Sequence, residues 1–163
     1  MSGIINSVGA RGGIVGSDDY PTGQVVQTVV DVKTVGTISM GNSTEIVTTG
    51  VASTITPKSA SNKIFVLVTG GCGHNPYPSQ ELRSTIHSSV NGTLAGGALL
   101  EVIGGGTNTL SFSSHSMSGY DAPATTATVT YTLYAGNSNG SLADVYFNIV
   151  AQRITITMME IAV

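Results

Sequence analysis

Apolar and polar residues alternate along most of this chain with a period of two, which is the period of a β-strand and not the 3.6-residue period of a helix. The clearest case is the stretch 128–135, where Val129, Tyr131 and Leu133 share one face and threonines share the other. β-Branched residues and repeated glycines also disfavour helix. The pattern predicts strands at 24–33, 44–55, 63–69, 82–90, 94–103, 110–117, 128–135, 144–150 and 153–161.

Turn signals separate these stretches. Asn91-Gly92 predicts a hairpin, and glycine-rich loops are expected at 104–108 and 136–140. The stretch 63–69 is apolar on both faces, as a central strand should be. This regular supply of short strands predicts an all-β fold, an antiparallel two-sheet sandwich that is jelly-roll-like, over residues 24–163.

Residues 1–23 differ from this body because they are rich in glycine and cannot build a core of their own. Glycine makes the ordering of such a segment costly in conformational entropy. One interpretation is a floppy terminus. The other is an extended docking arm, which orders when two apolar pairs meet a partner surface. The residues expected to make that contact are Ile4, Ile5, Ile14 and Val15.

The last predicted strand carries apolar residues on both faces near the end of the chain. Ile154, Ile156 and Met158 lie on one face, whereas Met159 and Ile161 fall on the other. Either a bulge shifts the register, or both faces are buried. Burial of both faces is what a subunit interface would produce, so Met159 and Ile161 are candidate interface residues.

The composition favours assembly. Charged residues make up only 9% of the chain, against roughly 25% in typical soluble domains. We therefore expect a surface coated with Ser, Thr and Asn, part of which is buried in an oligomer. The net charge of −3 without clusters of Lys or Arg argues against nucleic acid as a partner. No apolar run approaches the roughly 20 residues that would insert into a membrane, and no secretory signal is expected.

Candidate catalytic chemistry is sparse. The three histidines, His74, His87 and His115, are not spaced as metal ligands, and the two within strand patterns, His87 and His115, are expected to face outward. No serine lies in a G-x-S-x-G motif, and the glycine stretches match no phosphate-binding loop. The sequence predicts no enzyme, no metal and no cofactor.

Contact residues for a host receptor are the remaining candidates. Tyr77 and Tyr120 are expected in loops, with His74 near the first of them. Aromatic residues in loops supply contact area at low entropic cost, and they can stack on the sugars of a surface glycan. The competing interpretation is that these rings cover the ends of the sandwich core.

Several short segments resemble structural proteins from tailed bacteriophages of aquatic bacteria. They are the start of the chain, residues 1–9 and 13–16, and four segments of the body: 55–59, 62–66, 121–126 and 154–162. Members of this group are regarded as fibres or other virion surface proteins, often trimeric. The resemblance implies a protein of the virion, with an arm that docks on other virion proteins of the tail or capsid.

Three functions are consistent with this sequence. The first is a homotrimeric short tail fibre or receptor-binding module, which would use the loop aromatics for host attachment. The second is a capsid decoration or cement protein with the same arm and fold, which the small size of the chain favours. The third and weakest is a carbohydrate-binding protein.

Overall fold

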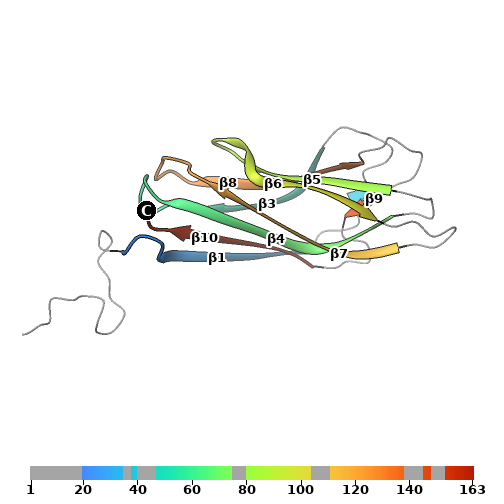
Figure 1. Ribbon diagram of the computed structural model, residues 1–163, viewed down its shortest axis with the longest axis horizontal. Coiled ribbons are helices and arrows are strands. Elements are labelled where there is room, and N and C mark those ends of the chain that lie inside the picture. The colour runs from blue at the N-terminus through green and yellow to red at the C-terminus, as the bar shows by residue number, and fades with distance from the viewer. Residues whose placement is uncertain are drawn as a thin grey trace, which may run out of the picture.

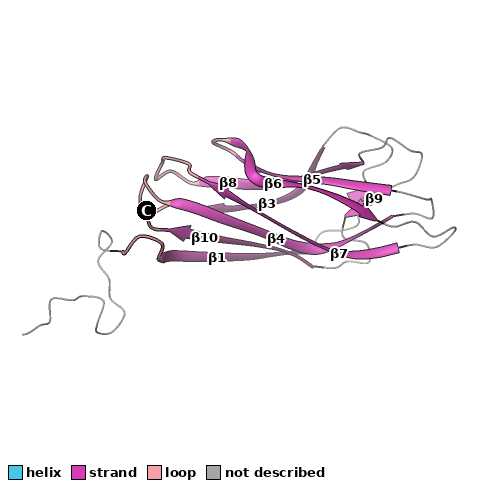
Figure 2. Cartoon of the chain, viewed as in Figure 1, coloured by secondary structure: helices cyan, strands magenta, loops and turns pink. Residues whose placement is uncertain are grey.

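The structure is a computed structural model that describes residues 20–34, 38–39, 47–74, 80–103, 111–137, 145–147 and 153–163. All regular elements in these ranges are strands (Figure 2). None of the described residues belongs to a helix that could cross a membrane. The strands are β1 (Val25–Thr34), β2 (Ile38–Ser39), β3 (Val47–Ile55), β4 (Lys63–His74), β5 (Gln80–Ser88), β6 (Gly92–Ile103), β7 (Ser111–Asp121), β8 (Val129–Asn137), β9 (Val145–Phe147) and β10 (Arg153–Ile161).

Two antiparallel four-stranded sheets form two layers (Figure 1). One sheet has the order β1-β10-β4-β7, and the other has the order β3-β8-β5-β6. The pair Ala95 and Tyr120 joins β6 to β7 between the two sheets. The short strands β2 and β9 pair with each other, and β9 also pairs with the far end of β4.

The connections between the eight long strands define a jelly roll. Only β5 and β6 follow one another within the same sheet, and they are joined at the predicted Asn91-Gly92 turn. Every other successive pair of long strands crosses from one sheet to the other, which is the double Greek-key pattern of jelly rolls. The predicted fold, an antiparallel jelly-roll-like sandwich, is therefore confirmed.

The core lies between the sheets and follows the predicted alternation. Val129, Tyr131 and Leu133 of β8 are each at most 1% exposed, as the pattern in 128–135 requires. Opposite them, β4 contributes Ile64, Val66 and Val68, and β10 contributes Ile154, Ile156 and Met158. Burying one such aliphatic side chain contributes roughly 1.5–3 kcal/mol. These three central strands therefore supply most of the apolar burial among the described residues.

The prediction that His115 faces outward is wrong. His115 is 1% exposed, and its Nε2 lies 3.0 Å from Ser84 Oγ on β5 of the opposite sheet. A polar ring can be buried here because it has a hydrogen-bonding partner. Met117 lies on the same inward side, so Ser114, Ser116 and Ser118 form the outward side.

Candidate interaction surface

The sheet β1-β10-β4-β7 turns one side to the core and the other side outward. We call the outward side the outer face. Pairing registers and burial define its members: Val25, Thr28, Val30, Val32 and Thr34 on β1; Arg153, Thr155, Thr157, Met159 and Ile161 on β10; Lys63, Phe65, Leu67 and Thr69 on β4; Ser114, Ser116, Ser118 and Tyr120 on β7. In the isolated chain, each of these side chains is at least partly exposed to solvent.

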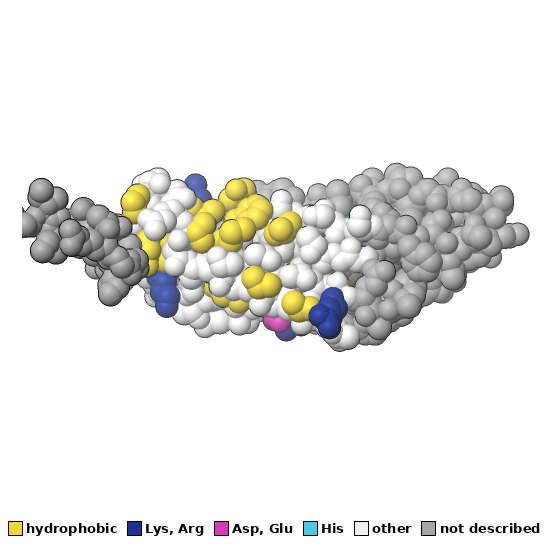
Figure 3. Space-filling view, turned by 90° about the horizontal axis from the view of Figure 1, so that it is seen from below, with side chains coloured by type: hydrophobic (Ala, Val, Ile, Leu, Met, Phe, Trp, Pro, Cys, Tyr) yellow, Lys and Arg dark blue, Asp and Glu magenta, His cyan; other side chains and the backbone are white. Residues whose placement is uncertain are grey.

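Apolar residues form a band across this face. In one register row, Tyr120 pairs with Phe65, which pairs with Met159 on β10. Leu67 lies in the next row, and Val30 and Val32 continue the band on β1. Val30 is 59% exposed, Val32 49% and Tyr120 55%. Figure 3, which views the molecule from this side, shows apolar side chains gathered among uncharged polar ones.

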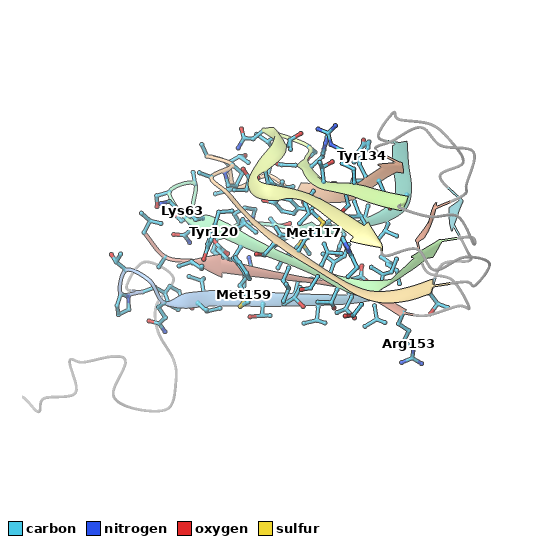
Figure 4. All side chains as sticks on the ribbon, turned by 45° about the vertical axis from the view of Figure 1, so that its right-hand side comes forward. Lys63, Met117, Tyr120, Tyr134, Arg153 and Met159 are labelled. Carbon is cyan, nitrogen blue, oxygen red and sulfur yellow. The ribbon has the colours of Figure 1, made fainter. Side chains whose placement is uncertain are left out.

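Among the residues of the outer face, charges occur only at its two ends, and the ion pair of Lys33 and Asp31 belongs to the other side of edge strand β1. Lys63 pairs with Ile161 in the first row, and Arg153 pairs with Thr34 in the last row. These two rows are eight positions apart along β10, or roughly 26 Å. Figure 4 shows Lys63 and Arg153 at opposite ends of the sheet. The described members of the face include no carboxylate, so its middle is neutral.

The prediction that Tyr120 lies in a loop is wrong, because β7 continues to Asp121. Its ring packs against Phe65 of β4, with centroids 5.0 Å apart and planes tilted by 52°. This pair holds the tyrosine on the sheet while more than half of its surface stays exposed. Tyr120 therefore belongs to the same row as the predicted interface residue Met159.

Two of the three receptor-contact candidates, Tyr120 and His74, are not brought together. Tyr120 pairs with Phe65 near the start of β4, whereas His74 is the last residue of that strand. Phe65 and His74 are nine positions apart in the sequence, which corresponds to roughly 30 Å in an extended strand. The side chain of His74 and the whole of Tyr77 lie outside the described residues. The arm residues Ile4, Ile5, Ile14 and Val15 lie outside them too.

Met159 and Ile161 lie on the outward side of β10, a strand paired on both edges. The pairing of β10 with β4 is continuous from Thr155 to Ile161, so no bulge interrupts it there. The register shift in this region is on β1, between Val25 and Gln27. A bulge in β10 therefore does not explain the apolar pattern. Met159 and Ile161 lie on the outward side of the strand. Both side chains are half-buried in one chain.

A buried carboxylate closes the adjacent end of the sandwich. Glu160 is 0% exposed, and its Oε1 accepts hydrogen bonds from Lys58 N (2.7 Å), Ser59 N (3.3 Å) and Asn62 Nδ2 (2.7 Å). Its Oε2 accepts one from Gln27 Nε2 at 2.5 Å. Four donors in place of a cation compensate the loss of hydration. Sequence reasoning missed this residue, although an acid at an inward position of an apolar strand was a signal.

A second polar cluster links the two sheets at the same end. Tyr131 Oη donates to Asp121 Oδ2 at 2.8 Å, and Asn91 Nδ2 donates to Asp121 Oδ1 at 2.7 Å. Burial, and then the hydrogen bond and charge of Asp121, raise the pKa of Tyr131. An open hollow of about 360 Å³ lies beside this cluster and is lined by Lys63, Tyr120, Asp121 and Ala122. Both carboxylate oxygens of Asp121 already accept hydrogen bonds from within the chain. The cluster therefore connects the two sheets.

No group of three or more potential metal ligands occurs within the described ranges. No protein-family model matches the sequence, and no curated protein matches it. Two solved structures show a slight likeness. A structure of the infectious bursal disease virus Gx strain shares 11% identity over 85% of this chain and 43% of its own, with a TM-score of 0.32. A crystal structure of an IBDV viral particle shares 9% over 84% and 40%, with a TM-score of 0.35.

This chain thus spans less than half of the length of either matched viral chain. At these TM-scores the likeness carries no argument about what this protein does. The geometry of the outer face, and not the comparison, is the basis for the functional proposal.

Proposed function

We propose that this chain is a virion structural protein of a tailed bacteriophage, acting as a homotrimeric short tail fibre or receptor-binding module. The observation that carries the proposal is the outer face, an apolar band on one side of a four-stranded sheet. Contiguous apolar patches of this kind on a protein surface mark interaction sites. A protein whose task is assembly needs such a surface, whereas an isolated soluble domain does not.

The architecture supports the proposal by analogy. Jelly rolls are common in viral capsid and lectin domains, although a fold does not imply a function. The structure also brings together two of the phage-like segments. Glu160, from 154–162, binds the backbone of Lys58 and Ser59, from 55–59. These two segments are therefore in contact in the folded chain.

The same end of the sandwich is where residues 1–19 join the body. Gly23 N donates to Ala162 O at 2.8 Å, and Ala162 N donates to Gln24 O at 2.9 Å. This pairing holds the last residue of the proposed arm, Gly23, beside the end of β10. In the proposal, Ile4, Ile5, Ile14 and Val15 of the arm dock on another virion protein, and the sandwich is held outward.

Deleting residues 2–16 tests the docking role of the arm. The deletion leaves the Gly23–Ala162 pairing intact, so the body should keep its circular dichroism spectrum and melting temperature. We expect the truncated protein to be absent from purified virions of a phage that carries the deletion. Normal packaging of the truncated protein would contradict the docking role.

A decoration or cement protein with the same arm and fold is the second candidate. Virions that lack the protein separate the two functions under heating or osmotic shock. Heads that leak their DNA indicate cement, and intact particles that fail to adsorb to the host indicate a fibre. Particles that neither leak nor lose adsorption would contradict both functions.

A further inference from the structure

We infer that the outer face packs against a second copy of this chain, with the Tyr120–Phe65 ring pair as an anchor of that contact. The inference rests on the proposed function, because it names the partner of the surface that carries it. It also assigns Tyr120 to subunit assembly and not to receptor contact. Charge, area and side-chain geometry each support a second copy as the occupant.

The charge of the face selects a partner that is also poor in charge. Its described members carry only Lys63 and Arg153, at opposite ends, and no acid. A typical soluble protein, with roughly 25% charged residues, would place unpaired charges against the neutral middle. Burying an unpaired charge is costly. This chain has only 9% charged residues, so a second copy supplies the matching surface.

The area of the face suits a stable protein–protein contact. Four strands spaced about 4.8 Å apart, each about ten residues long at about 3.3 Å per residue, cover roughly 600 Å² in projection. A standard interface buries about 800 Å² of accessible surface on each partner, and accessible surface exceeds projected area. One copy can therefore cover most of this face without help from another element.

The side chains resemble those of an interface core. Tyrosine is enriched among the residues that dominate binding energy, and Phe65 already holds the Tyr120 ring in place. A ring ordered before binding loses less entropy when the partner arrives. Around the anchor lie Ser116, Ser118, Thr155 and Thr157, whose hydroxyls are small and uncharged. They can approach another copy without the cost of removing a charge from water.

The mass of the purified full-length protein tests the inference. Val30→Glu and Tyr120→Glu each place a carboxylate in the apolar band at a site more than half exposed in one chain. The matched control is Val90→Glu. Val90 is 50% exposed but lies in the turn between β5 and β6 of the other sheet. Circular dichroism and melting curves verify that each variant folds, and Tyr120→Phe retains the ring if the glutamate variant fails to fold.

Light scattering coupled to size exclusion measures the mass of each protein in solution. We expect the wild type, Val90→Glu and Tyr120→Phe to share one oligomeric mass. Val30→Glu and Tyr120→Glu should move to the 16.6 kDa of one chain, with association weakened at least tenfold. A wild type that is monomeric at tens of micromolar overturns the inference. Folded Val30→Glu and Tyr120→Glu proteins that keep the wild-type mass overturn it as well.

The same proteins separate this inference from the proposed function. Immunoblots of purified virions test the proposed function, because they detect the chain in the particle. The mass in solution tests the contact between copies. A wild-type chain that is present in virions but monomeric in solution overturns the inference and leaves the function standing. An oligomeric chain that is absent from virions does the reverse.

Discussion

Glu160→Gln is the most informative single substitution in the described structure. It keeps the shape of a side chain that is 0% exposed but replaces one acceptor oxygen with a donor. With the amide oxygen at the Oε1 position, the bonds from Lys58, Ser59 and Asn62 are retained. The amide nitrogen then faces Gln27 Nε2, which is another donor.

Gln27 cannot resolve this conflict by turning its amide over. Its Nε2 also donates to Thr56 O at 2.7 Å, and a flipped amide would place an oxygen against that carbonyl. One buried donor therefore loses its acceptor, at a cost of about 1–3 kcal/mol. The three retained bonds weaken too, because a neutral acceptor replaces a charged one. The variant no longer buries a charge, which offsets part of this loss of stability. We therefore expect the free energy of unfolding to fall by about 3 kcal/mol.

Thermal unfolding at a fixed protein concentration measures the effect, because an oligomer melts at a concentration-dependent temperature. For a chain of this size, 1 kcal/mol corresponds to about 2–4 °C, so Glu160→Gln should melt about 6–12 °C lower. The control is Asp31→Asn. Asp31 forms a partly exposed ion pair with Lys33 at 2.6 Å, and such pairs contribute at most about 1 kcal/mol. If both variants melt equally close to the wild type, the role given to Glu160 is refuted.

Three further substitutions have distinct expected results. Tyr131→Phe should lose about 1–2 kcal/mol near neutral pH, where the bond to Asp121 is made. Because the pKa of Tyr131 is raised, the contribution of this tyrosine to stability is complete below about pH 10, the ordinary tyrosine pKa, and falls above it. The unfolding free energies of the two proteins, measured by urea titration, should therefore converge above about pH 10. A difference that stays constant with pH would contradict this. Gly92→Ala forces alanine to a φ of 71° and should lower the melting temperature by about 2–6 °C; an unchanged value would refute the strain. Ala124 already has a φ of 51°, so Ala124→Gly should leave the melting temperature equal or up to about 3 °C higher, and a clear drop would count against it.

Local patterns in the sequence were sufficient for the long strands and for the fold class, although they ended β7 before Tyr120. The alternation at 128–135 places Val129, Tyr131 and Leu133 in the core, where the structure has them. The predicted hairpin occurs at Asn91-Gly92: β5 ends at Ser88 and β6 starts at Gly92, where glycine accepts the positive φ of the turn. Such signals operate within a few residues, so they can be recognised without knowing the rest of the fold.

The side of a strand that faces the core depends on more distant residues. In β7 the sequence alternates, but His115 is inward because Ser84 on the opposite sheet offers it a hydrogen bond. In β1, Val29 packs against the core, so the alternating residues Val30 and Val32 are outward and exposed. Alternation defines two faces but does not choose between them.

The strand order decided the candidate site. Tyr120 and Met159 are 39 positions apart in the sequence, yet they lie in one row because β4 runs between their strands. The same order separates Tyr120 from His74, another of the receptor-contact candidates. The sequence alone established an all-β chain poor in charge, with apolar residues left over at Met159 and Ile161. The tertiary structure gathered those residues into one outer face, because pairing between distant strands sets which side chains become neighbours.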